Sequence, residues 1–173
     1  MTEKQEKILN SAIQLFAKEG YNAVSTRSIA HKAGVSEGLI FRHFKSKKGL
    51  LESLLKIGEQ RLEKTILSIE ELTHPKVILK HVISLPFNMD RNQKDFWKLC
   101  YSLGWQIETP ELVFFDRLKN KVISAFKSLG LSDAHTEASA FMLILDGAMV
   151  YILLKNPQNA FVIYEALLEK FQL

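Results

Sequence analysis

The sequence has little of what several protein classes need. Its single cysteine, Cys100, cannot form a disulfide within the chain, which favours a reducing compartment. With 8 glycines and 4 prolines in 173 residues, it lacks the turn residues that a β-sandwich or barrel needs every ~8–12 positions. The first residues are charged, unlike a secretory signal, and the apolar run Phe141–Leu154 is shorter than the ~20 residues that span a bilayer. We expect a soluble, cytoplasmic protein without membrane association.

Patterns typical of catalysis are also missing. The five histidines include no pair at i, i+4 that would suit a metal ion. The sequence contains neither a glycine-rich phosphate loop nor the strand-turn-helix motif that carries a nucleophilic serine. The sequence therefore predicts no enzyme, no metal site and no cofactor.

The positive charge is concentrated in the first quarter of the chain. Of 23 Lys and Arg residues, nine lie within Met1–Lys48, against four of the 19 acidic residues. That segment carries +5, and the remainder of the chain carries −1. Such asymmetry is typical of a polyanion-binding module joined to a neutral one, although a solvated basic surface has the same composition.

Hydrophobic periodicity predicts an all-α chain. Apolar residues recur at helical spacing throughout, and no stretch alternates with period 2 as a strand does. Thr2, Ser25, Ser36 and Ser46 are suitable N-caps, while Gly20 and Gly34 are suitable C-terminal stops. We predict nine helices, over residues 2–20, 26–33, 37–44, 47–72, 75–85, 92–105, 109–130, 132–155 and 159–173.

The second and third predicted helices have the features of a helix-turn-helix. Both are short, and Gly34 lies in the tight turn between them. Ala30 is small where the two helices must approach, and Val35 can anchor the turn in the core. In a helix-turn-helix the second helix enters the DNA major groove. Many helical bundles share the bare pattern, so its place in the basic quarter of the chain strengthens the DNA-binding interpretation.

Residues 8–51 also resemble a known family in order and spacing. The matching positions are Ile8-Leu9, Ala12, Leu15-Phe16, Gly20-Tyr21, Ile29-Ala30, Ala33-Gly34-Val35-Ser36, Phe41-Arg42-His43-Phe44, Ser46-Lys47 and Leu50-Leu51. In these the chain resembles the TetR (tetracycline-repressor-like) transcriptional regulators. The resemblance implies a nine-helix dimer with a helix-turn-helix DNA-binding domain, here residues 1–48. A regulatory domain for ligand binding and dimerisation would then follow over residues 49–173.

Two groups of residues are candidates for DNA contact. The predicted phosphate contacts are Ser25, Thr26 and Arg27 at the start of the second helix and Lys47, which matches the family's phosphate-binding lysine. The predicted base-reading face of the third helix carries Ser36, Glu37, Gly38, Leu39, Arg42 and His43. Arginine can read guanine, and glutamate can accept from cytosine. The capping serines can instead serve only the backbone, and His43 can instead be packed or solvated.

Leu39 and Phe41 depart from the family pattern. The family commonly has a polar residue at the first position and tyrosine at the second. Phe41 lacks the hydroxyl that would bind a phosphate, and either side chain could touch a thymine methyl group instead.

The C-terminal helices have long apolar seams. Seam positions recur three and four residues apart, which is typical of helix–helix packing. The eighth helix is apolar on its other faces too, so we expect a second subunit to cover it, with burial inside one domain as the alternative. The predicted dimer interface is Phe141, Leu145, Ala148, Ile152, Phe161, Tyr164 and Leu168.

Seven of the 17 aromatic residues lie between Phe87 and Phe115. A helical bundle needs some of them for its core, but together with the family resemblance they suggest an apolar ligand pocket among the fifth to eighth helices. The candidate pocket residues are Phe87, Phe96, Trp97, Cys100, Tyr101, Trp105, Phe114, Phe115 and Leu118.

Together these patterns predict a ligand-responsive transcriptional regulator. We expect a repressor that binds a palindromic double-stranded DNA operator as a homodimer and is released by a small, mostly apolar effector. The alternative is a helical carrier or sensor of hydrophobic ligands that does not bind DNA, which Leu39 and Phe41 keep open.

Overall fold

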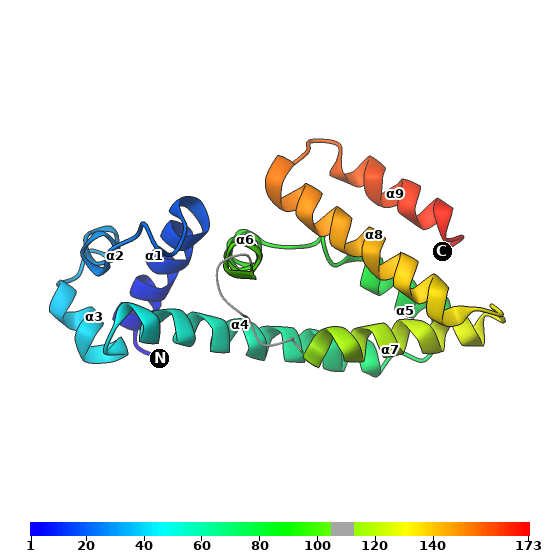
Figure 1. Ribbon diagram of the computed structural model, residues 1–173, viewed down its shortest axis with the longest axis horizontal. Helices are drawn as coiled ribbons and strands as arrows, with labels where there is room; N and C mark the ends of the chain where they lie inside the picture. The colour runs from blue at the N-terminus through cyan, green and yellow to red at the C-terminus, as the bar shows by residue number, and fades with distance from the viewer. Residues whose placement is uncertain (105–112) are drawn as a thin grey trace. The chain divides into compact units, whose positions relative to one another are not determined.

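The computed structural model describes residues 1–104 and 113–173, and only the backbone of Gly104, Val113 and Phe114. Within that part of the chain there are nine helices and no strand, which confirms the all-α prediction (Figure 1). The helices are α1 (Glu3–Glu19), α2 (Thr26–Ala33), α3 (Glu37–Phe44), α4 (Lys47–Glu70), α5 (Pro75–Ser84), α6 (Arg91–Gly104), α7 (Val113–Ser128), α8 (Ala134–Lys155) and α9 (Ala160–Lys170). The predicted start of the seventh helix, at residues 109–110, lies outside the described residues.

Most of the predicted helix ends are confirmed by their hydrogen bonds. Thr2 and Gln5 form a reciprocal capping box at α1, and the Ser25 hydroxyl accepts from the Ser28 amide at α2. Gly34 ends α2 in the left-handed conformation, with φ of 66°, which glycine adopts at little cost. Ser36 is the N-cap residue of α3, as predicted, but its side chain makes no capping hydrogen bond there.

The helices pack as two compact units. Unit 1 contains residues 1–61 together with α6, and unit 2 contains residues 62–89 together with α7, α8 and α9. The division falls within α4, so this helix contributes its N-terminal part to unit 1 and its C-terminal part to unit 2. These units are defined by packing. The division by function that we predict, with a DNA-binding domain over residues 1–48 and a regulatory domain over residues 49–173, stays a prediction.

The core of unit 1 joins the first three helices to α4 and α6. Ile8, Phe16, Ile29 and Ile40 are fully buried within it. The long helix α6 packs along α1. Gly58 of α4 allows a close approach, since an added Cβ there would overlap the ring of Phe96 on α6.

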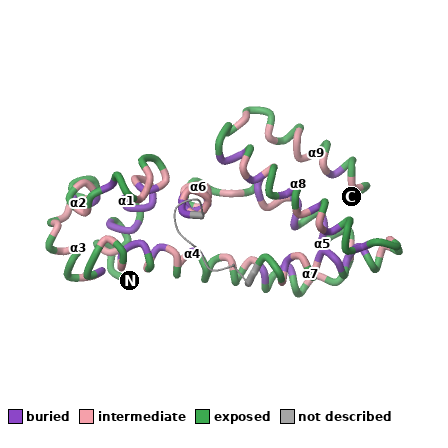
Figure 2. Tube along the Cα trace, in the orientation of Figure 1, coloured by how far each residue is buried: buried purple, intermediate pink, exposed green. Residues whose placement is uncertain are grey.

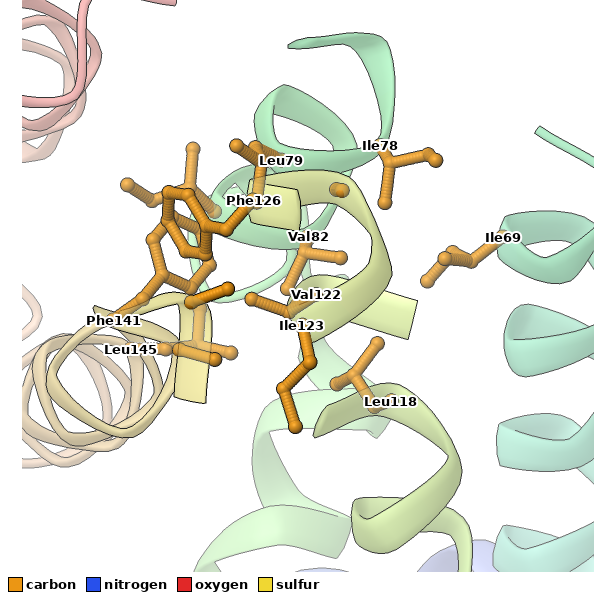
Figure 3. Close-up of a cluster of buried hydrophobic side chains, with 14 of the residues drawn as sticks. Ile69, Ile78, Leu79, Val82, Leu118, Val122, Ile123, Phe126, Phe141 and Leu145 are labelled. Carbon is orange, nitrogen blue, oxygen red and sulfur yellow. The ribbon is translucent and has the colours of Figure 1, made fainter. Parts of the chain in front are cut away.

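The core of unit 2 gathers apolar side chains from α4, α5, α7, α8 and α9 (Figure 3). The Phe126 and Phe141 rings meet edge to face at 5.7 Å between centroids, a favourable geometry for aromatic pairs. Ion pairs tie α7 to the C-terminal part of α4. The Arg117 guanidinium bonds Glu70 through Nη2 at 2.6 Å and Glu63 through Nη1 at 2.8 Å. These bonds to Arg117 lower the pKa of Glu70.

The dimer seam predicted on α8 is buried inside the chain itself. Phe141, Leu145 and Ile152 are at most 7% exposed, and Leu168 of α9 is equally covered, so no partner can bury them further. For these four residues the prediction is corrected. Ala148 and Tyr164 are half-buried, and Phe161 is 70% exposed.

The other side of α8 is open to solvent, and buried and exposed residues alternate along this helix in Figure 2. The exposed side is mostly apolar, with Ala140, Leu143, Gly147, Tyr151 and Leu154, and Asp146 is exposed beside them. Leu143 and Leu154 are each 74% exposed. By length and composition alone α8 could cross a membrane, and only 28% of its most apolar window is buried. Exposed apolar surface of this kind is typical of an interaction site.

Candidate nucleic-acid interface

The α3 helix separates a buried side from an exposed side. Ile40 and Phe44, four residues apart, are 0% and 8% exposed and fix the helix to the core of unit 1. Arg42 is exposed on the other side, and Phe41 is 45% exposed beside it. Ser36 and Gly38 are also exposed, whereas Leu39 and His43 are half-buried. The predicted base-reading face is therefore solvent-accessible at Ser36, Gly38 and Arg42, and Phe41 is exposed beside it.

His43 is turned toward the start of α1. Its Nδ1 lies 3.3 Å from Nε2 of Gln5, and its ring meets Phe44 edge to face. The sequence interpretation did not foresee Gln5 as a partner, because the two residues are 38 positions apart. This arrangement favours the packed alternative for His43 over a phosphate contact.

The first turn of α2 presents hydrogen-bond donors at the surface. Ser25 is exposed, but its hydroxyl already accepts from the backbone amide of Ser28. Arg27 is exposed, and an exposed cation at a helix N-terminus suits a phosphate group. Thr26 is half-buried, and its Oγ1 donates to Oε1 of Glu37 at 2.6 Å. That bond joins the first turns of α2 and α3.

Lys47 is already engaged by the loop between α1 and α2. Its Nζ donates to the carbonyl oxygens of Val24 at 2.7 Å and Asn22 at 3.3 Å. The same ammonium lies 4.4 Å from the centroid of the Tyr21 ring, a cation–π distance. Lys47 thus fastens the loop that leads into α2, and an ammonium has three donors, so one remains for a phosphate.

Sequence reasoning missed this role of Lys47. Tyr21 belongs to the residues that carry the family resemblance, and it was the available sign that an aromatic ring lies at this corner. The two acceptors are backbone carbonyl oxygens, which every residue type has, so the sequence could not identify them.

The nine candidate pocket residues are divided between the two units. Phe96 and Trp97 are buried in unit 1 with Cys100 and Tyr101 on the same helix, while Phe87, Phe115 and Leu118 belong to unit 2. Trp105 and the side chain of Phe114 lie outside the described residues. Among the described residues, a hollow beside α1 and α2 and another between α5 and α9 are lined by other side chains. The ligand pocket stays a prediction.

Cys100 is not set up as a reactive thiol. Its burial, followed by the negative charge of Glu59, raises the pKa of the thiol to about 12. A thiol with such a pKa stays protonated at neutral pH, and the thiolate is the reactive form. The residue acts as a small apolar side chain in this part of α6.

Comparison with known proteins places the chain in a family. Residues 8–54 match the family described as bacterial regulatory proteins, tetR family. The chain is 45% identical to the uncharacterized HTH-type transcriptional regulator YvkB of Bacillus subtilis (strain 168), over 60% of this chain and 71% of that protein. It is 32% identical to a second such regulator of that organism, YvdT, over 70% of this chain and 68% of that protein.

Solved structures share the whole fold. A transcriptional regulator from Saccharomonospora viridis in complex with choline superposes with a TM-score of 0.77, at 21% identity over 99% of this chain and 96% of that one. The regulator FadR from Bacillus subtilis, in complex with stearoyl-CoA, gives a TM-score of 0.65 at 22% identity over 95% of both chains. The match of residues 8–54 to the family and the similarity to YvkB and YvdT, together with the exposed α3 face, identify the chain as a member of the TetR family and a DNA-binding transcriptional regulator.

Proposed function

We propose that this regulator is a cytoplasmic repressor that binds a palindromic operator as a homodimer and is released by a small, mostly apolar effector. The observation that carries the proposal is the exposed side of α3, with Arg42 in its last turn, in the basic first quarter of the chain. Lys45 at the C-terminal end of α3 and Lys47 and Lys48 at the start of α4 supply cations for the DNA backbone. Arg42 is the candidate for reading guanine in the major groove.

The homodimer is supported by the uncovered face of α8. A second copy of the same chain would present the same apolar face, so the two would cover each other around a twofold axis. The exposed Phe161 and Val162 of α9, 70% and 63% exposed, extend the apolar surface of unit 2. Two α3 helices about 34 Å apart would then read two half-sites, about one DNA turn from centre to centre.

Small-molecule binding by proteins of the same fold supports an effector for this chain. FadR of Bacillus subtilis was solved with stearoyl-CoA, whose acyl chain is apolar, and the Saccharomonospora viridis protein with choline, which is a cation. The mostly apolar character that we propose for the effector rests on the aromatic residues in the sequence from Phe87 to Phe115. An effector acts by binding one of two conformations more tightly, so release requires weaker effector binding in the DNA-bound form. The comparisons do not favour the carrier that lacks DNA binding.

The proposal is tested by two substitutions that remove one cation each. Wild-type protein first enriches its preferred sequence from a pool of random duplex DNA, and this sequence is the selected duplex. Arg42→Ala is expected to relax the base preference at one base pair per half-site. The lost discrimination between the right and the wrong base should be about 1–3 kcal/mol. Lys47→Ala is expected to weaken binding to every sequence and to lower the slope of log K against log salt by about 1.

Lys127→Ala is the matched control, since it removes an exposed cation from α7 in unit 2. Anisotropy titrations of the selected duplex and its single-base variants, at several salt concentrations, measure both quantities. Unchanged preference in Arg42→Ala together with an unchanged salt slope in Lys47→Ala would contradict the proposed docking.

A further inference from the structure

One hydrogen bond connects the two helices of the helix-turn-helix through their side chains. Thr26 Oγ1, in the first turn of α2, donates to Oε1 of Glu37, in the first turn of α3. At 2.6 Å the bond is short, as expected when the acceptor is a carboxylate, and both side chains are half-buried. Thr26 and Glu37 were both predicted to contact DNA, and in the structure they bind each other.

A hydroxyl group has one proton to donate. While Thr26 gives that proton to Glu37, it cannot donate to a phosphate oxygen. The carboxylate beside the hydroxyl would also repel a phosphate placed there, because like charges disfavour each other. Phosphate binding at this end of α2 therefore falls to the backbone amides and to Arg27.

We propose that Thr26 is a positioning residue that holds the Glu37 carboxylate for base reading, rather than a phosphate contact. This inference rests on the proposed operator binding by α3. With Oε1 fixed by Thr26, Oε2 is the oxygen left to accept a hydrogen bond from the amino group of a cytosine. A carboxylate held in one rotamer discriminates between bases better than a mobile one, because it presents its acceptor at one place and cannot turn toward a different base edge. Less side-chain entropy is also lost on binding.

Gly38 supports this role from the next position. Nothing lies within 4 Å of a Cβ added there, so neither packing nor a positive φ requires glycine. Glycine weakens a helix relative to alanine, yet it stands in the first turn of α3. Its missing side chain leaves the space next to Glu37 open for the edge of a base pair.

The test compares Thr26→Val with Thr26→Ser on the selected duplex and on duplexes in which each base pair is changed in turn. Valine keeps the shape of threonine without the hydroxyl, and serine keeps the hydroxyl. In wild type we expect roughly 10-fold weaker binding when the cytosine read by Glu37 is replaced. Thr26→Val should reduce this ratio to about 2-fold with no change in salt slope, and Thr26→Ser should retain it.

Glu37→Gln keeps an oxygen for Thr26 and adds an amide donor. With that oxygen held by Thr26, the amide group is left as a donor, so this variant should lose the preference for cytosine and favour a base that offers an acceptor in the major groove. Thermal unfolding of all three variants shows whether each is folded at the temperature of the titration.

The outcomes separate the two claims. If wild type enriches no sequence from the random pool, the proposed operator binding fails and this inference with it. If wild type selects a sequence but Thr26→Val and Glu37→Gln leave every base preference unchanged, only the inference fails. If Thr26→Val weakens binding to all duplexes equally, its hydroxyl binds phosphate, and the positioning role is wrong.

Discussion

Replacing Leu143 with lysine is expected to convert the protein from dimer to monomer and to weaken binding to the selected duplex by more than about 100-fold. Leu143 is 74% exposed at the centre of the uncovered face of α8, so lysine there does little to one copy alone. In a dimer with twofold symmetry the substitution occurs twice in the interface, where a buried charge costs several kcal/mol. A monomer binds a single half-site, so it loses the affinity that a dimer gains by binding two half-sites at once.

Val77→Lys is the matched control for this substitution. Val77 lies on α5 and is 47% exposed, so the variant receives the same charge at an exposed apolar position off the α8 face. Sedimentation equilibrium gives the mass of each variant, and anisotropy gives its affinity for the selected duplex. If Leu143→Lys remains as dimeric as Val77→Lys, the α8 face is not the interface.

Gly58→Ala is expected to destabilise unit 1 by roughly 1–3 kcal/mol, although alanine is normally the better helix residue. The added methyl group would overlap the Phe96 ring, which is 9% exposed and has little room to move. Phe96 also meets the Trp97 indole edge to face at 5.9 Å between centroids. Displacing the ring should therefore change the tryptophan fluorescence together with the stability.

Three further variants, Gly38→Ala, Phe96→Ala and the double variant Gly58→Ala/Phe96→Ala, show whether the overlap with Phe96 is the cause. Gly38→Ala introduces the same methyl group in a helix where nothing lies within 4 Å, so it should stabilise by about 0.5–1 kcal/mol. In a Phe96→Ala background the effect of Gly58→Ala should largely disappear, because the atoms that it displaces are gone. Urea unfolding measures all four free energies. An equal penalty in both backgrounds would mean that the Phe96 contact is not responsible.

The α3 helix shows what periodicity predicts well. Ser36, Gly38 and Arg42, which were predicted on the base-reading face, are exposed, and Ile40 and Phe44, four residues apart, form the buried side. Glu37, Leu39 and His43 of the same predicted face are half-buried. The capping residues Thr2 and Ser25 acted locally and were equally predictable. Features set by neighbours within one helical turn could be recovered in this way.

The α8 helix shows where periodicity fails. It is apolar on every side, so a seam drawn at intervals of three and four fits several faces equally well. The seam through Phe141 and Leu145 proved to be the side buried in the core of unit 2, and the exposed face lies around Leu143. Which face of α8 stays exposed is decided by how α8 packs in the core of unit 2 with α5 and α7.

Contacts between distant residues were beyond the sequence for a different reason. Lys47 meets carbonyl oxygens more than 20 positions away, and backbone acceptors are the same for every residue type. The hydrogen bond between Thr26 and Glu37 spans 11 positions and depends on how the turn places two helix ends. Lys47, Thr26 and Glu37 were all predicted as functional residues from the sequence, but only the structure identifies the groups that they bind.

The central claim is that the exposed side of α3 reads base sequence in duplex DNA. Its most direct measurement is the affinity of wild-type protein for the selected duplex relative to a shuffled duplex of the same composition, at near-physiological salt. We predict at least about 1,000-fold tighter binding to the selected duplex, with two half-sites about 10 base pairs apart. Equal affinity for the two duplexes, or no salt-sensitive complex with either, would contradict it.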